Sequence, residues 1–152
     1  MMDLQFMDIV ARLLLALVLG LLLGLERIHQ HKTIGMRVYS LVSMAACLFV
    51  VMAQMFSADT NTSSVEVTRI MGQVVTGVGF LGAGVILHYE KVVQNITTAA
   101  ALWVAAGVGV ACALGYYQEA ALVTGITLLL VEGLARVEKY LLVKWGGTAI
   151  DS

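Results

Sequence analysis

A set of polar side chains stands inside or beside long hydrophobic segments of this chain, where polar groups are rare. A charged group at membrane depth is costly, so each is a candidate for ligand binding, ion passage or contact with a partner. The competing interpretation is that they form ion pairs at helix ends, with arginines reaching toward the headgroups. The candidates are Asp8, Arg12, Glu26, Arg27, Arg37, Arg69, Gln73, Thr97, Thr98 and Glu132.

Helix rise divides these candidates into two groups on opposite sides of the membrane. Asp8 and Arg12 are four residues apart, as are Glu132 and Arg136, a spacing that pairs side chains on one helix face. Thr97 or Thr98 could instead cap the helix that follows. The outer group, a possible buried cluster, is Asp8, Arg12, Arg69, Gln73 and Glu119. The inner group is Glu26, Arg27, Arg37, Asn95, Thr97, Thr98 and Glu132.

The composition shows what must position these residues. Hydrophobic residues make up 60% of the 152 residues and charged residues 12%, about half the share in a soluble domain. The composition therefore argues strongly against a water-soluble globular enzyme, and the net charge of −1 argues against nucleic-acid binding. We predict an all-α fold, a polytopic helical bundle in a membrane.

Five segments are long and apolar enough to be predicted spans. The first has 13 uncharged residues between Arg12 and Glu26, about 20 Å of helix, so Arg12 should lie within or at the edge of the membrane. The fifth could alternatively lie on the membrane surface as an amphipathic helix. The predicted spans are 8–26, 38–56, 70–88, 97–115 and 118–136, which form a transmembrane domain 1–136 followed by a cytoplasmic or interfacial tail 137–152.

The distribution of Lys and Arg predicts the orientation of these spans. With five spans, seven of the nine basic residues fall on the side that holds Arg27, Arg37, Lys91 and the tail. Basic loops are retained in the cytoplasm, so the N-terminus is expected outside and the C-terminus in the cytoplasm.

Small residues mark the expected helix contacts. Gly72, Thr76, Gly79 and Ala83 follow one helical face, which predicts that segment 70–88 lies at the centre of the bundle. The Gly-x-Gly-x-x-Gly pattern that begins at Gly77 lacks a preceding strand, so no dinucleotide or other cofactor is expected. Metal binding is left open. The predicted packing glycines are Gly20, Gly24, Gly72, Gly77, Gly79, Gly82, Gly84 and Gly107.

Four blocks in order carry a family resemblance: ARLLLALVLGLLLGLER at 11–27, GMR at 35–37, RIMGQVVTGVGFLGAGVI at 69–86 and TTAAALWVAAGVGVA at 97–111. Together they resemble the MgtC/SapB family of bacterial inner-membrane proteins, in a short form without a C-terminal cytoplasmic domain. The resemblance implies a multi-pass helical protein linked to low-magnesium adaptation and, in pathogens, to virulence. Its matched polar positions are Arg12, Glu26, Arg27, Arg37, Arg69, Gln73, Thr97 and Thr98.

These observations favour a non-enzymatic membrane protein that contacts partner proteins through its helices and lies among membrane lipid. No phosphate-binding or phosphorylation motif supports an ATPase. The resemblance implies P-type magnesium transporters and the F-type ATP synthase as partner classes, and the glycine faces suggest a homo-oligomer, of which a dimer is one form. Two alternatives stay open: a small transporter or channel for magnesium or another solute, and a purely structural scaffold.

Overall fold

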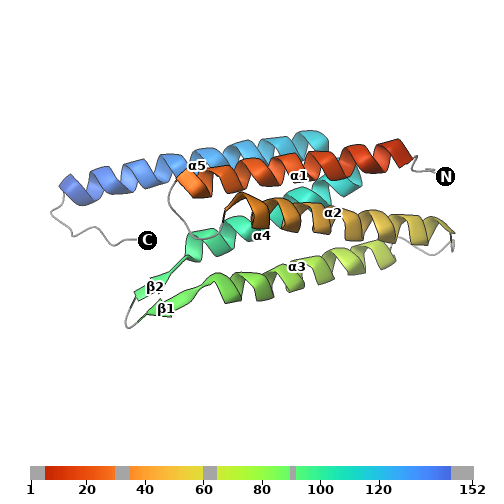
Figure 1. Cartoon of the computed structure of the whole chain (residues 1–152), viewed down its shortest axis with the longest axis horizontal. Helices are drawn as coiled ribbons and strands as arrows, with labels where there is room; N and C mark the ends of the chain where they lie inside the picture. The colour runs from red at the N-terminus through yellow and green to blue at the C-terminus, as the bar shows by residue number, and fades with distance from the viewer. Residues whose placement is uncertain (1–5, 30–34, 60–64, 90–91, 145–152) are drawn as a thin grey trace.

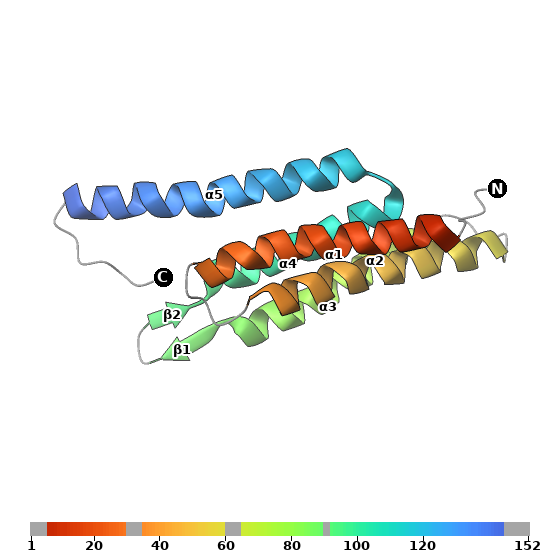
Figure 2. The same ribbon diagram turned by 45° about the horizontal axis from the view of Figure 1, so that its top comes forward.

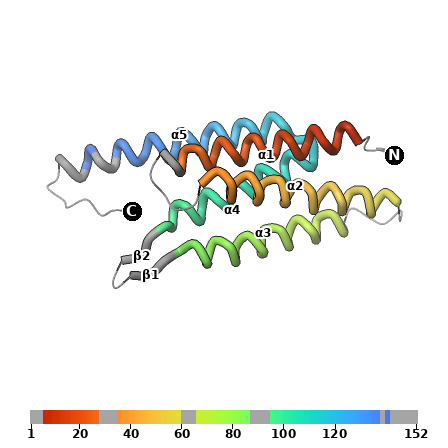
Figure 3. The backbone as a smooth tube through the Cα atoms, in the orientation of Figure 1, coloured from red at the N-terminus to blue at the C-terminus, as the bar shows by residue number. Residues whose placement is uncertain are grey.

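The computed structural model describes residues 6–29, 35–59, 65–89 and 92–144, which form five helices and one short hairpin (Figure 1). The backbone trace in Figure 3 follows the same path from helix to helix. The elements in chain order are α1 (Phe6–His29), α2 (Met36–Asp59), α3 (Val65–Val85), β1 (Leu87–Tyr89), β2 (Val92–Gln94), α4 (Ile96–Leu114) and α5 (Tyr117–Lys144).

Successive helices run in opposite directions, so the bundle has two ends (Figure 1). The hairpin end contains the last turns of α1 and α3, the first turns of α2 and α4, and the C-terminal part of α5. The opposite end contains the first turn of α1 and the turn between α4 and α5. The start of α1 and the end of α5 therefore lie at opposite ends.

Helix α4 is the centre of the bundle and packs against α1, α2, α3 and α5. Its small residues, such as Ala101, Ala105 and Ala106, allow neighbours to approach from several sides, and all three are buried. The prediction that segment 70–88 is central is therefore wrong. Helix α3 lies at the edge of the bundle and buries a stripe that includes Val78, while most of its surface is exposed.

Three glycines allow close approach of helix backbones. A Cβ atom added to Gly20 would lie 2.7 Å from the carbonyl oxygen of Tyr39, and one added to Gly24 would lie 2.5 Å from Cα of Met36. A Cβ atom on Gly109 would overlap the carbonyl oxygen of Ser43. These contacts join α1 to α2 and α2 to α4, with no room for a methyl group.

The remaining predicted packing glycines differ from Gly20 and Gly24. A Cβ atom on Gly82 would make an ordinary contact, 3.7 Å from Cβ of Ala99. The other five would meet no atom within 4 Å of the added Cβ, so they do not pack closely against the described helices. These five are Gly72, Gly77, Gly79, Gly84 and Gly107.

Four helices among the described residues, α1, α2, α4 and α5, are long and apolar enough to cross a membrane. Helix α3 is not one of them, although its sequence predicted a span, because Glu66, Arg69, Gln73 and its glycines lower its hydropathy. Helix α5 meets the criterion over Tyr117–Val137. That length and composition favour spanning over the surface alternative, and the helix continues to Lys144 beyond the predicted boundary.

A short hairpin, absent from the all-α prediction, connects α3 to α4. Its strands pair antiparallel, with Leu87 opposite Gln94 and Tyr89 opposite Val92. After the hairpin, Asn95 adopts a left-handed conformation with φ 67° and stands at the N-cap of α4. Asparagine tolerates this region better than most residues other than glycine. Neither Thr97 nor Thr98 is the cap, contrary to the structural alternative in the sequence interpretation.

Candidate functional site

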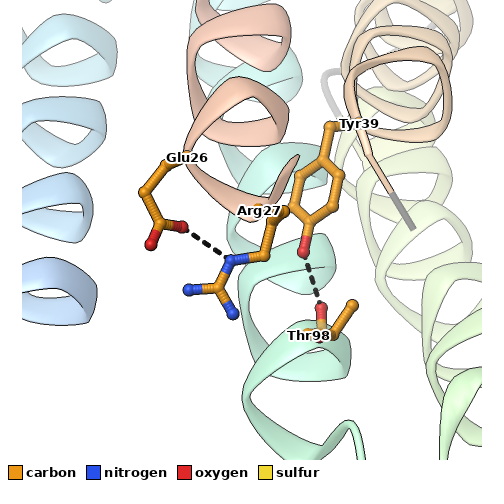
Figure 4. A network of polar contacts seen from close by, with 4 residues as sticks. All are labelled: Glu26, Arg27, Tyr39 and Thr98. Atoms are coloured by element: carbon orange, nitrogen blue, oxygen red, sulfur yellow. Dashed lines mark hydrogen bonds and ion pairs between the residues drawn. The ribbon is translucent and has the colours of Figure 1, made fainter. Parts of the chain in front are cut away.

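A buried polar cluster lies at the hairpin end and joins three helices (Figure 4). Glu26 and Arg27 come from the last turns of α1, Tyr39 from the start of α2 and Thr98 from the start of α4. Nε of Arg27 donates to Oε2 of Glu26 at 2.6 Å, and the Tyr39 hydroxyl donates to the carbonyl oxygen of Thr98 at 2.9 Å. We call these four residues the Arg27 cluster. It contains three of the polar residues expected on the inner side.

The Arg27 cluster contains several polar atoms with no hydrogen-bond partner among the described residues. Arg27 is only 1% exposed, yet both of its terminal nitrogens, Nη1 and Nη2, are buried and unpartnered. Oε1 of Glu26 and Oγ1 of Thr98 are also buried and unpartnered. A buried polar atom without a hydrogen-bond partner is costly. The Arg27 nitrogens and the Thr98 hydroxyl therefore lack acceptors, and the Glu26 oxygen lacks a donor.

A second cluster lies at the opposite end, around Arg12. Nη2 of Arg12 lies 2.9 Å from Oδ2 of Asp8, which confirms the pairing predicted from their spacing. Nη1 of Arg12 donates to the carbonyl oxygen of Ala113 in the last turn of α4. A helix leaves its last carbonyls unpaired and its C-terminus partly negative, so a buried arginine stabilises it. Arg12 therefore ties α1 to the end of α4.

The other residues predicted for the outer cluster do not join Arg12. The Arg69 side chain is 73% exposed, and its guanidinium lies 4.0 Å from the Glu66 carboxylate on the same helix. Gln73 lines a groove between α2 and α3, and Glu119 lines an apolar groove of about 340 Å³ formed by α3, α4 and α5. The predicted five-member cluster is wrong, because α3 and the start of α5 present these side chains away from Arg12.

The remaining inner candidates are also dispersed. Glu132 accepts a hydrogen bond from Arg136, which confirms the second predicted pair, but both side chains are exposed on α5. Figure 2 shows α5 on the outside of the bundle. Arg37 and Thr97 are exposed.

The structure adds Tyr39, which sequence reasoning missed. Tyr39 is fully buried, and it joins α2 to α4 through its bond to Thr98. The signal was present, because a tyrosine at the end of an apolar span brings a hydroxyl that usually finds a partner when buried.

Apolar residues separate the two clusters. Between Arg12 and Arg27, helix α1 buries Ala16, Leu19 and Leu23, and α4 buries Leu102 beside them. The region between the clusters is therefore mostly apolar, and the buried, unpartnered Ser43 hydroxyl beside Gly20 is a polar group within it. Within the same residues, no group of three or more His, Cys, Asp or Glu side chains could hold a metal ion.

A smooth surface on α3 is the other candidate site. Gly72, Thr76, Gly79 and Ala83, which we call the glycine face, are all exposed, opposite the buried Val78. The Thr76 hydroxyl donates to the carbonyl oxygen of Gly72 at 3.0 Å, so it is already satisfied within the helix. The glycine face therefore offers a shallow surface on which another helix backbone could pack closely.

Comparison with known proteins shows similarity over most of the chain. The model of the MgtC family matches residues 13–140. Protein MgtC of Brucella abortus (strain 2308) is 40% identical over 121 residues, which cover 80% of this chain and 48% of that protein. Protein MgtC of Salmonella typhimurium (strain LT2) is 38% identical over 134 residues, which cover 86% of this chain and 55% of that protein. The chain thus spans about half the length of these curated relatives. No solved structure matches it.

Proposed function

Since the chain belongs to the MgtC family, we propose that it is a non-enzymatic protein of the bacterial inner membrane that supports adaptation to low magnesium. It acts by binding a partner membrane protein through helix contacts. The N-terminus lies outside and the C-terminus in the cytoplasm, as the distribution of basic residues favours when α3 crosses the membrane with the other four helices.

The observation that carries this proposal is the exposed glycine face of α3. Lipid tails are as apolar as leucine, so membrane helices associate by close packing at small residues and not by hydrophobic burial. Gly72 and Gly79 make no close contact with the described residues of the other helices, although their spacing is typical of helix contacts. A helix from another protein would use that surface and would cover α3, most of whose surface is exposed in this chain.

Two kinds of occupant fit the glycine face: a second copy of this chain and a different membrane protein. Among different proteins, a P-type magnesium transporter or the F-type ATP synthase is the class that family resemblance favours. The transport alternative has less support, because apolar residues such as Leu19 and Leu102 separate the two polar clusters.

Leucine in place of Gly72 and Gly79 should abolish growth support at low magnesium while leaving the protein folded. Among the described residues, neither site has an atom within 4 Å of an added Cβ and both lie on an exposed face, so the larger side chains should project outward and block a partner helix. The measurement is growth of a deletion strain, complemented with each variant, at low and high magnesium. Protein level in the membrane is measured in parallel.

Gly133→Leu in α5 is the matched control, since an added Cβ there also meets no atom of the described residues within 4 Å. It should complement like the original chain. Normal growth of the strain that carries both α3 replacements, at normal protein level, would show that the glycine face is not the contact surface.

A further inference from the structure

We propose that the Arg27 cluster is a binding site for a phosphate group that also carries a hydrogen-bond donor. The ligand is either the headgroup of a phospholipid such as phosphatidylglycerol or free inorganic phosphate. This inference concerns the chain itself and does not depend on the glycine face or on any protein partner.

The Arg27 guanidinium supplies the charge that recognises the anion. Only Nε is engaged, by Oε2 of Glu26 at 2.6 Å, so the edge formed by Nη1 and Nη2 keeps its donors free. This planar edge suits two oxygens of one phosphate group. Arg27 is only 1% exposed, so leaving these donors without a partner is costly.

The start of α4 adds donors beside this guanidinium. Asn95 stands at the N-cap but makes no side-chain bond to the first amides of the helix, so these amides lack a side-chain cap. The Thr98 hydroxyl oxygen in this first turn is buried and unpartnered. Tyr39 bonds to Thr98, and Figure 4 shows the Tyr39 ring beside Arg27, which places the two donor groups in one neighbourhood. A helix N-terminus favours anions.

Glu26 determines which phosphate groups fit. Its side chain is 11% exposed, and Oε1 is buried with no donor among the described residues. A bare anion would leave that oxygen unpaired and would be repelled by it. A phosphate that carries its own hydroxyl, or a headgroup with a glycerol hydroxyl, satisfies Arg27 and Glu26 together. Sulfate and a phosphocholine headgroup have no such donor and should be rejected.

Calorimetry of inorganic phosphate and sulfate binding to the detergent-purified chain tests whether free phosphate is the ligand. Native mass spectrometry of the chain in mixed micelles, with phosphatidylglycerol and phosphatidylcholine offered together, tests whether a phospholipid headgroup is the ligand. We expect phosphate or phosphatidylglycerol to be retained, and sulfate and phosphatidylcholine to be excluded. Arg27→Gln should lower the affinity for the retained ligand by at least about tenfold, which is the effect of losing hydrogen bonds from a charged donor.

Arg136→Gln is the matched control, because it removes an exposed arginine that is also paired with a glutamate. It should leave binding unchanged. Glu26→Gln keeps the site testable if Arg27→Gln fails to fold: the amide supplies its own donor, so this variant should accept sulfate and phosphatidylcholine. Retention of neither phosphate nor phosphatidylglycerol would overturn the proposal, as would equal retention of sulfate and phosphate or of the two lipids. Equal binding by folded Arg27→Gln would do the same.

Discussion

Gly109→Ala should lower the free energy of unfolding by about 1 to 3 kcal/mol, the range for adding one group to a packed core. The added methyl would overlap the carbonyl oxygen of Ser43, a backbone atom that moves only if α2 and α4 separate. Because α4 contacts every other helix, that separation would loosen the whole bundle. Unfolding of the purified protein by SDS in mixed micelles measures the change.

Gly107→Ala provides the control on the same helix. Its Cβ would meet no atom within 4 Å, so the variant should unfold like the original chain or gain up to about 1 kcal/mol from helix propensity. A Gly109→Ala protein as stable as Gly107→Ala would contradict the close approach of α2 and α4.

Arg12→Met should destabilise the bundle by about 2 to 4 kcal/mol. Methionine keeps an apolar stem, so the loss reports mainly on the polar contacts of the guanidinium. Arg12 is only 6% exposed, and it bonds both Asp8 and the carbonyl oxygen of Ala113 at the end of α4. Removing the guanidinium leaves the Ala113 carbonyl oxygen without this donor, whereas Asp8 is 39% exposed and can bind water instead. The same SDS titration measures the effect.

Arg136→Met is the control that measures how much an exposed ion pair contributes to stability. Arg136 and Glu132 have the same four-residue spacing as Arg12 and Asp8, but both side chains are exposed. The expected loss is about 0.5 kcal/mol or less. Equal losses in the two variants would show that Arg12 does not stabilise α1 and α4 in the way described.

Local spacing predicted the contacts that occur within one helix. The Asp8 and Arg12 pair, and the Glu132 and Arg136 pair, follow from four-residue spacing alone. The bond from Arg12 to Ala113 could not be predicted, because its acceptor is a backbone carbonyl about a hundred positions away along the chain. Tertiary packing, which no local pattern specifies, places that carbonyl beside α1.

The small residues of α3 show a second limit of sequence reasoning. Three- and four-residue spacing identifies a smooth face but not what packs on it. Gly20 packs against α2 within the chain, whereas Gly79, in an equally small-residue setting, is exposed. Arg69 and Gln73 beside the glycine face were the signal that α3 lies at the edge. The hairpin was missed because a short apolar run such as Leu87 to Tyr89 fits a helix or a strand.

Photo-crosslinking from α3 tests most directly whether the glycine face binds another protein. Phe80, which is 81% exposed and flanks the glycine face, is replaced by a photoreactive phenylalanine in cells grown at low magnesium. Leu129 of α5, 76% exposed, is replaced in the same way as the control. We expect a discrete protein adduct from position 80 that Gly79→Leu abolishes, and no such adduct from position 129. Lipid adducts alone from both positions, or a protein adduct that survives Gly79→Leu, would contradict helix contact through this face.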